Sequence, residues 1–407
     1  MNNFYASVEC MRRPELKDKY VAVCGSREDR HGIVLAKNQK AKEMGVTTGE
    51  AIWQAKLKCP QLIVVEPDFE EYIKYSNLAK KIYYRYTDRV EPFGLDECWL
   101  DVSGSTLLFG SGCDIAMKIK EDIKRELKLT VSVGVSFNKI FAKLGSDMKK
   151  PDAVTYIPED GFKEKIWGLD ASELLGVGRA TATKLRQRGV NTIGDLANTR
   201  PELLKSWLGI NGVRLWNYAN GRDYSEVAMY SQTPPIKSIG HGITCTADLG
   251  SNAEVWKVIF SLTGDVAHRL RKHGLLAEGI SIAVKDIGLR QREFQCRLNR
   301  PARNVRELSN AAFELFKSKY NWDKQVRALS VRAISLINDT EANLQISMFE
   351  NVNRDLKHES IECAMENIRS MYGKKSVTFA RLLGDLKLPE KENVCMFKPG
   401  GFAAANP

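Results

Sequence analysis

A multidomain α+β fold is the architecture that the sequence predicts, and three observations point to it. The chain has 407 residues, which at about 100 to 200 residues per domain corresponds to two to four domains. Short apolar runs of strand length alternate with helical stretches through residues 1–157. The consecutive prolines Pro234 and Pro235 exclude a helix and favour extended backbone, so they mark a linker between folded parts.

The first 157 residues contain the alternating patterns. Apolar runs at Tyr20–Cys24, Leu62–Val65 and Thr130–Val135 predict strands. The periodic stretches Glu70–Tyr86 and Cys113–Leu127 predict helices. We therefore expect a mixed unit that is large enough to carry a catalytic site.

Beyond residue 157 the pattern changes twice. Helical periodicity with glycine turns continues to Gly221 and predicts a small all-helical domain. After the proline linker we expect a second mixed domain, with helices at Glu254–Lys272 and Val305–Tyr320 and strands at Gly279–Val284, Glu293–Leu298 and Val326–Leu336. The tail after Glu350 holds one predicted helix, Ile361–Met371, and we expect its last residues to be frayed.

The charge of the chain favours a polyanionic partner. Lys and Arg number 61 against 50 Asp and Glu, which gives a formal net charge of +11. Residues 236–340 hold 17 of the basic and 10 of the acidic residues, so about a quarter of the chain carries +7 of that excess. Such clustering suits a phosphate backbone, because each neutralised phosphate releases a counterion. From charge alone, an anionic membrane surface and plain solubility remain alternatives.

Two other classes of protein are disfavoured. No stretch approaches the ~18 consecutive apolar residues of a membrane span, and the N-terminus leads into no apolar signal segment. We therefore expect a cytoplasmic protein without a membrane role. The nine cysteines form no C-x-x-C pair and the five histidines form no H-E-x-x-H pattern, so we expect reduced thiols and no zinc site.

The most informative local pattern is an adjacent carboxylate pair, Asp96 and Glu97, at the entrance of an apolar strand. Neighbouring strand residues point to opposite faces, so both can reach one ion only at a strand end or hairpin tip. Pro92 and Gly94 predict such a turn. Paired carboxylates with substrate phosphates form an oxygen site suited to Mg²⁺. A solvated acidic turn is the alternative interpretation.

Two further patterns are each weak alone. Phe4 and Tyr5 are adjacent aromatics at the start of the chain, and such pairs most often belong to a hydrophobic core. Residues 136–151 space lysines over a predicted helix that ends before a proline. That spacing suits phosphate contacts, although a solvated basic face would show the same pattern.

Together the three patterns are specific. The motifs F-Y-A-S-V-E at residues 4–9, G-L-D-E-C-W-L-D-V at 94–102 and S-x-N-K-x-x-A-K-x-x-S-D-x-x-K-P at 136–151 closely resemble those of Y-family translesion DNA polymerases. The nearer match is the UmuC-like, or ImpB/MucB/SamB, branch, and the resemblance covers roughly residues 1–349.

The resemblance implies a right-hand polymerase built from four domains and a tail. These would be a ferredoxin-like palm (1–9 and 68–157), small fingers (10–67), a helix-hairpin-helix thumb (158–230), a linker (231–236), an α/β little finger (237–341) and a tail with a clamp-binding motif (342–407).

The resemblance also implies roles for residues of the palm and fingers. Asp96 and Glu97 would be the catalytic carboxylates that hold two Mg²⁺ ions, with the carbonyl of Met1 at the place of another metal ligand. Tyr5 would be the steric gate against a ribose 2′-hydroxyl, and Phe4 and Tyr5 would offer backbone amides to the dNTP. The triphosphate would contact Gln39, Lys42 and Lys150, although relatives often have a tyrosine at the position of Gln39. Gly32, Ile33 and Leu35 would form the roof over the nascent base pair.

The remaining implied contacts involve primer-template DNA and a sliding clamp. Gly176 and Gly178 lie in a segment similar to the helix-hairpin-helix of the thumb, where glycines let backbone amides approach a phosphate. A simple helix connection is the alternative for that turn, and Leu208–Gly212 resembles a degenerate second copy. Arg332 would contact phosphate from the little finger. Gln345, Met348 and Phe349 match the bacterial clamp-binding motif. A need for RecA or a UmuD-like protein stays open.

One departure from the family pattern affects the metal site. Relatives carry an apolar strand ending in an aspartate immediately before the position of Met1, and that aspartate bridges both metals. Asn2 and Asn3 are amides and cannot supply the missing charge. Without this strand, the backbone groups of its neighbours should be unpaired. We expect an internal methionine as the recorded start; a true truncation is the alternative.

Three functional hypotheses follow. The first is a low-fidelity, template-directed DNA polymerase that transfers a nucleotide from dNTP to a primer 3′-hydroxyl. The second is a noncatalytic DNA- and clamp-binding protein. The third, a helix-hairpin-helix nuclease, gives no reason for Tyr5 beside Phe4.

Overall fold

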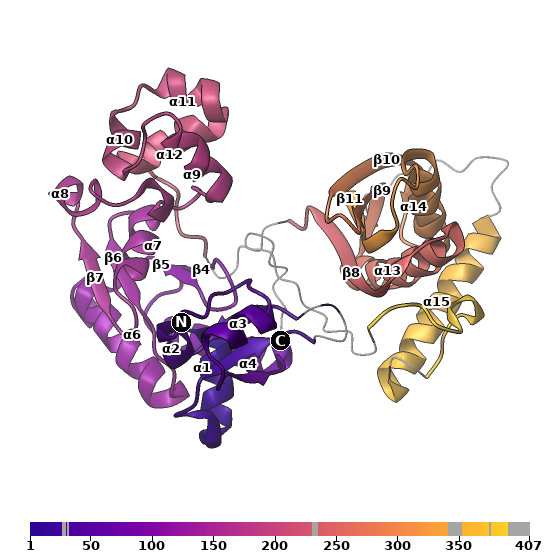
Figure 1. Ribbon diagram of the computed structural model, residues 1–407, viewed down its shortest axis with the longest axis horizontal. Helices are drawn as coiled ribbons and strands as arrows, with labels where there is room; N and C mark the ends of the chain where they lie inside the picture. Colours follow the sequence, from indigo (N-terminus) through magenta and orange to yellow (C-terminus); the bar gives the residue numbers. More distant parts are fainter. Residues whose placement is uncertain (27–29, 31, 230–234, 341–351, 374–375, 390–407) are drawn as a thin grey trace. The chain divides into compact units, whose positions relative to one another are not determined.

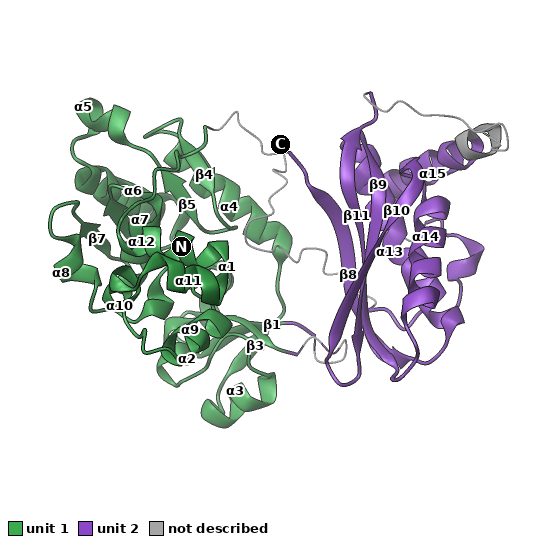
Figure 2. Cartoon of the chain, turned by 90° about the horizontal axis from the view of Figure 1, so that it is seen from above, with its two compact units in different colours: residues 1–24, 33–233, 394–407 green, residues 25–32, 234–393 purple. Residues whose placement is uncertain are grey.

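The computed structural model describes the whole chain except residues 27–29, 31, 230–234, 341–351, 374–375 and 390–407 (Figure 1). The chain separates into two compact units (Figure 2). The described residues of unit 1 lie within Met1–Cys24 and Ile33–Thr233, and those of unit 2 lie within Gly25–Gly32 and Pro234–Asn393. Among the described helices, none combines the length and apolar character that crossing a membrane requires.

Unit 1 begins with a helix and a small three-stranded sheet. The elements are α1 (Phe4–Arg12), η1 (Pro14–Leu16), β1 (Val21–Cys24), β2 (Val34–Lys37), α2 (Gln39–Glu43), α3 (Ile52–Lys58) and β3 (Ile63–Val65). The sheet has the order β2-β1-β3, with β1 antiparallel to β2 and parallel to β3. All four residues of β1 are buried because this strand is central, as its unbroken apolar run predicts.

The second part of unit 1 carries two strand pairs and three longer helices. Its elements are α4 (Phe69–Tyr83), β4 (Val90–Pro92), β5 (Cys98–Leu100), η2 (Ser103–Ser105), α5 (Thr106–Phe109), α6 (Gly112–Leu127), β6 (Val133–Ser136), α7 (Lys139–Met148) and β7 (Val154–Ile157). Strands β4 and β5 form an antiparallel hairpin, while β6 and β7 pair in parallel. Helices α4 and α6 begin at the side-chain caps Asp68 and Ser111, and their apolar faces share one core with α1.

Helices make up the remainder of unit 1. They are α8 (Phe162–Ile166), η3 (Ala171–Glu173), α9 (Arg179–Arg186), α10 (Ile193–Asn198), α11 (Pro201–Leu208) and α12 (Ile210–Ala219), and α9–α12 form one cluster (Figure 1). Gly176 precedes α9 with φ +95°, and Gly209 separates α11 from α12 with φ +66°. Both turns use left-handed backbone that favours glycine. The core of this cluster includes Ile140, Phe141 and Leu144 of α7.

Unit 2 is a four-stranded antiparallel sheet covered on one side by helices (Figure 2). Its elements are β8 (Ser238–Leu249), α13 (Asn252–Lys272), β9 (Leu275–Asp286), β10 (Gln291–Ala302), α14 (Val305–Lys319), β11 (Val326–Asn338), α15 (Val352–Tyr372) and η4 (Ala380–Leu382). The strand order is β10-β9-β11-β8. The buried residues of α13 and α14 form one core with the strands.

Unit 2 differs from the sequence expectation in several places, and β9 and β10 are each longer than the expected strands Gly279–Val284 and Glu293–Leu298. Strand β8 was not expected, because Gly240, His241 and Gly242 interrupt its apolar pattern. The expected tail helix Ile361–Met371 is longer, spanning Val352–Tyr372, and it is tied to α13 by ion pairs to Arg271. The assignment of palm, fingers, thumb and little finger within these units stays a prediction.

Candidate active site

The tip of the β4–β5 hairpin presents Asp96 and Glu97, as the turn residues predict. The amide of Phe93 donates to the carbonyl of Glu97 at 2.9 Å and closes the turn. Ser76 Oγ of α4 donates to the carbonyl of Leu95, so the turn is fixed to a buried helix face. The side chains of Asp96 and Glu97 are 33% and 36% exposed. Both carboxylates are therefore held in place and accessible to ligands.

A cavity of about 230 Å³ lies beside the carboxylates. Asp96, Glu97 and Met1 line it, together with Lys143 and Lys150. Residues of β5 and β6 also line it, and among the described strands each of the two pairs on one side only. Unpaired strand edges of this kind were expected beside the carboxylates. The α-ammonium of Met1 lies 3.5 Å from Asp96 Oδ2 and donates to the carbonyl of Asp96 at 2.8 Å.

Close packing brings α7 to this cavity. A Cβ added at Gly134 of β6 would lie 1.8 Å from the carbonyl oxygen of Ala142, so only glycine allows the approach. Helix α7 begins at Asn138, whose side chain accepts from the amide of Phe141 at 2.8 Å. Trp99 Nε1 of β5 donates to the carbonyl of Lys139 at 2.9 Å. These contacts fix the start of α7 against the carboxylate hairpin.

A chain of alternating charges joins the carboxylates to the end of α7. Lys143 Nζ lies 2.7 Å from Glu97 Oε1 and 2.9 Å from Asp147 Oδ2, and Lys150 Nζ lies 2.5 Å from Asp147 Oδ1. Burial alone would lower the pKa of Lys143, but its bonds to Glu97 and Asp147 outweigh burial and raise the pKa. Burial opposes a low pKa for Asp147, yet the two lysines hold that pKa below its ordinary value. The paired charges therefore favour the charged forms of both Lys143 and Asp147.

The donor set of the hairpin tip fits a divalent ion. Carboxylate oxygens suit Mg²⁺, which keeps waters and takes further ligands from substrate phosphates. Within the described part of the chain, no three acidic, histidine or cysteine side chains are grouped closely enough to hold a metal. Backbone carbonyls, waters and phosphate oxygens are further oxygen ligands of the kind that Mg²⁺ takes. Burial raises the pKa of the neighbouring Cys98 thiol to about 12.

Phe4 and Tyr5 lie on the first turn of α1. Phe4 is buried in the core shared with α4 and α6. Tyr5 is half-buried, and its ring stacks on Tyr72 with centroids 4.3 Å apart. The core interpretation of these aromatics therefore holds for Phe4, whereas the ring of Tyr5 is partly accessible.

The expected triphosphate residues of the fingers lie on α2. Lys42 is exposed, and Gln39 Nε2 donates to Glu43 Oε1 at 3.1 Å. Burial and, after it, the positive charge of Lys42 lower the pKa of Lys37 on the neighbouring strand. The sequence analysis assigned no individual role to Lys37 or Lys143, although Lys143 lies within the lysine-bearing motif at residues 136–151. Of the residues expected in the roof over the base pair, Leu35 lies in β2 and Ile33 immediately precedes that strand. The side chain of Ile33 is exposed.

The expected DNA contacts fall in both units. Gly176 and Gly178 form the turn before α9. Arg332 is on β11 of unit 2 with its side chain 39% exposed, and its Nη1 lies 4.0 Å from Glu293 Oε1. The clamp-motif residues Gln345, Met348 and Phe349 lie outside the described residues.

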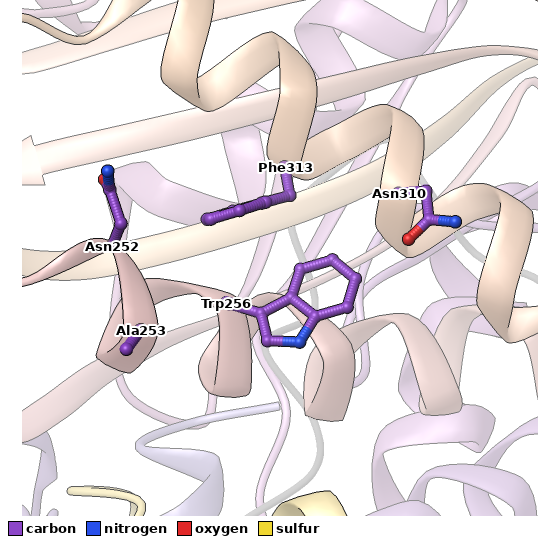
Figure 3. A pocket seen from close by; sticks show the side chains of 5 residues that line it. All are labelled: Asn252, Ala253, Trp256, Asn310 and Phe313. Atoms are coloured by element: carbon purple, nitrogen blue, oxygen red, sulfur yellow. The ribbon is translucent and has the colours of Figure 1, made fainter.

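A second hollow, of about 320 Å³, lies on unit 2 between α13 and α14 (Figure 3). Trp256 of α13 and Phe313 of α14 face each other across it, with centroids 4.9 Å apart. Asn252, Ala253 and Asn310 complete its lining. It has no acidic or basic lining residue, so it is distinct in chemistry from the carboxylate cavity.

Comparison with solved structures places this fold among Y-family DNA polymerases. A Y-family chimera built from Dbh and Dpo4 superposes with a TM-score of 0.74 at 23% identity, covering 83% of this chain and 97% of that chain. An insertion ternary complex of Dbh DNA polymerase gives a TM-score of 0.57 at 23% identity, with the same coverage of 83% and 97%.

Comparison with families and curated relatives identifies the family. Residues 1–147 match the impB/mucB/samB family, residues 236–348 its C-terminal domain, and residues 172–223 the thumb domain described for DNA polymerase iota. A protein named DNA polymerase IV from Acetivibrio thermocellus is 52% identical over 95% of this chain and 96% of its own length. DNA polymerase IV 1 of Bacillus subtilis is 35% identical over 93% of this chain and 90% of its own length. The chain belongs to the impB/mucB/samB family of Y-family polymerases, and membership implies dependence on divalent metal.

Proposed function

We propose that this chain is a DNA-directed DNA polymerase that extends primers past damaged template bases. The single observation that carries the proposal is the carboxylate pair at the hairpin tip, which faces a cavity bordered by Lys143 and Lys150. Acidic metal ligands beside fixed cations are what phosphoryl transfer requires. The names of the relatives support the same activity. DNA and dNTP are then its substrates, and the cytoplasm is where it would act.

Different residues of unit 1 would bind the metal ions, position the triphosphate and select the sugar. Asp96 and Glu97 would hold two Mg²⁺ ions, with the Met1 carbonyl as a further ligand. Bound there, the ions would stabilise the attacking and leaving oxygens of an in-line displacement. Lys150, Lys42 and Gln39 would position the triphosphate, together with the backbone amides of Phe4 and Tyr5. Tyr5 would exclude a ribose 2′-hydroxyl.

DNA binding would use contacts that ignore base sequence. Backbone amides at Gly176 and Gly178 would meet a phosphate, since no side chain blocks the approach. Arg332, on the sheet of unit 2, would contact another phosphate of the DNA backbone. The concentration of basic residues between 236 and 340 supports this role. Contacts to the DNA phosphate backbone do not depend on the bases, so such binding tolerates damaged bases.

A sliding clamp is the proposed partner of residues Gln345, Met348 and Phe349. The support is their match to a short extended motif whose apolar side chains enter a pocket. Replacing Met348 and Phe349 by alanine should abolish co-elution with a bacterial clamp while leaving DNA binding intact. RecA and UmuD-like proteins would be tested as additions to the same experiment.

A noncatalytic DNA- and clamp-binding protein is the second candidate. It would use the basic residues between 236 and 340 and the motif at Gln345, Met348 and Phe349 without nucleotide turnover. It predicts DNA binding without nucleotide incorporation.

Primer extension separates the two candidates. The purified chain would be given primed undamaged and abasic templates, dNTP and Mg²⁺, beside Glu97→Gln and the matched surface variant Asp88→Asn. The polymerase proposal expects incorporation on both templates that Glu97→Gln removes and Asp88→Asn keeps. DNA binding without incorporation, both by this chain and by the same chain preceded by an apolar strand ending in aspartate, would favour the second candidate.

A further inference from the structure

The ring of Tyr5 is held by aromatic contacts on α4. Tyr72 stacks on it at 4.3 Å between centroids with an interplanar angle of 12°, and Phe69 meets its edge at 5.9 Å and 80°. Tyr72 is completely buried. Because α1 and α4 share one core, the plane of the Tyr5 ring follows the position of Tyr72.

Tyr72 is itself anchored by a buried carboxylate. Its hydroxyl donates to Glu9 Oε1 at 2.6 Å, and Glu9 has no exposed surface. The other oxygen, Oε2, has no hydrogen bond and lies 3.4 Å from a guanidinium nitrogen of Arg13. Burial, and then the bond to Glu9, raise the pKa of Tyr72 well above its ordinary range, so the phenol stays a donor.

The anchor and the gate lie on the same face of one helix. Tyr5 and Glu9 are four residues apart on α1, so their side chains are neighbours on its surface. Tyr72 contacts both, stacking on Tyr5 and donating to Glu9. A buried polar group with one partner is costly to leave unpaired, so this arrangement holds Tyr72 in one position.

We propose that Tyr72 is a specificity-determining residue, which selects deoxyribonucleotides by fixing the ring of Tyr5 through the Glu9–Tyr72–Tyr5 contacts. The inference rests on the proposed polymerase function. Tyr72 does not touch substrate; it is a positioning residue. A gate without a flat surface behind it can turn to another rotamer and make room for a 2′-hydroxyl.

The test compares nucleotide selection in four variants of the full chain. Tyr72→Met fills similar space without a flat face, Tyr72→Phe keeps the face, Tyr75→Met is the matched control on the same helix, and Tyr5→Ala removes the gate. The readout is the dGTP/GTP ratio of kcat/KM opposite template dC. The same ratio is measured by equilibrium binding of non-hydrolysable dGTP and GTP analogues on primed DNA, which does not depend on turnover.

We expect Tyr72→Met to reduce the discrimination ratio about two- to tenfold, the factor that one lost aromatic contact gives. Tyr72→Phe keeps the flat face but loses the bond to Glu9, so its ratio should fall between those of Tyr72→Met and wild type. Tyr75→Met should keep the wild-type ratio even where its melting temperature falls, because a merely structural loss does not change sugar selection. If Tyr72→Met does not fold, Phe69→Leu, which removes the edge contact, should shift the ratio in the same direction.

The outcomes separate a failure of the role of Tyr72 from a failure of the proposed polymerase function on which that role rests. A wild-type ratio in Tyr72→Met, or in Phe69→Leu if that variant is needed, would overturn the role of Tyr72, provided Tyr5→Ala loses discrimination. A wild-type ratio in Tyr5→Ala would instead overturn Tyr5 as the gate. Equal binding of both analogues by the wild-type chain would contradict both.

Discussion

Lys143 Nζ lies 2.7 Å from Glu97 Oε1, so a lysine of α7 neutralises one of the two carboxylates at the hairpin tip. Its side chain is 17% exposed and also contacts Asp147. The orientation of Glu97 therefore depends on a residue that is not itself a metal ligand.

Replacing Lys143 by methionine tests that dependence. We expect kcat/KM for dNTP incorporation to fall about 10- to 100-fold, as when a group that orients a metal ligand is lost. The Mg²⁺ concentration for half-maximal activity should rise, and calorimetry should show weaker metal binding. Lys81→Met, on the surface of α4, is the matched control and should match wild type. Equal activity of Lys143→Met and Lys81→Met would refute the role.

The stability of unit 1 should depend on pH through Asp147. Its folded-state pKa is lowered, so its contribution is fully present above the unfolded pKa of about 3.9 and disappears as the pH falls through the folded value. We expect the difference in melting temperature between wild type and Asp147→Asn to be constant from about pH 8 to 5 and to shrink below about pH 4. Thermal scans across this range measure it. A difference that persists unchanged to pH 2 would show that the charge of Asp147 contributes nothing.

The contact between β6 and α7 should tolerate no side chain at Gly134. A Cβ there would lie 1.8 Å from a backbone oxygen, so β6 and α7 must separate. We expect Gly134→Ala to lower the free energy of unfolding by about 3 kcal/mol. Gly104→Ala, where a Cβ meets nothing within 4 Å, is the control and should change it by less than about 0.5 kcal/mol. Urea unfolding compares the two, and equal midpoints would contradict the close approach.

Helix α15 should depend on a buried ion pair. Arg271 Nη1 lies 2.6 Å from Glu362 Oε2, and their side chains are 10% and 7% exposed. We expect Arg271→Met to destabilise the attachment by about 3 to 5 kcal/mol, because the buried Glu362 loses the counter-charge of Arg271 and, among the described residues, keeps only the amide of Val305 as a donor. Adding Glu362→Leu should recover part of the loss. Hydrogen exchange of the α15 amides measures the loss in Arg271→Met and the recovery in the double variant. Additive losses in the double variant would show that the two residues act independently.

The sequence predicts those parts of the molecule that local chemistry determines. Pro92 and Gly94 place Asp96 and Glu97 at a hairpin tip, and the structure has that hairpin. The periodicity of Glu254–Lys272 predicts a helix, which the structure extends by two residues to Asn252. Glycine turns at Gly176 and Gly209 separate helices because left-handed backbone is a local preference.

Contacts between distant segments could not be predicted in this way. Lys143 and Glu97 are 46 residues apart, and Arg271 and Glu362 are 91 apart. Neither pair leaves a periodic signal, because each depends on how helices and strands pack. The same reason hides the stacking of Tyr5 on Tyr72, although Tyr5 itself stands in a recognisable motif.

Incorporation by the 407-residue chain and its Asp96→Asn variant tests the central claim most directly. Both would be assayed on primed templates with Mg²⁺ and dNTP, beside the same chain preceded by an apolar strand ending in aspartate. We expect incorporation by the 407-residue chain or by the extended chain. Asp96→Asn should reduce that incorporation more than about 100-fold, which exceeds the loss expected for a residue that only orients a metal ligand. Incorporation that survives Asp96→Asn, or none from either chain, would contradict the account.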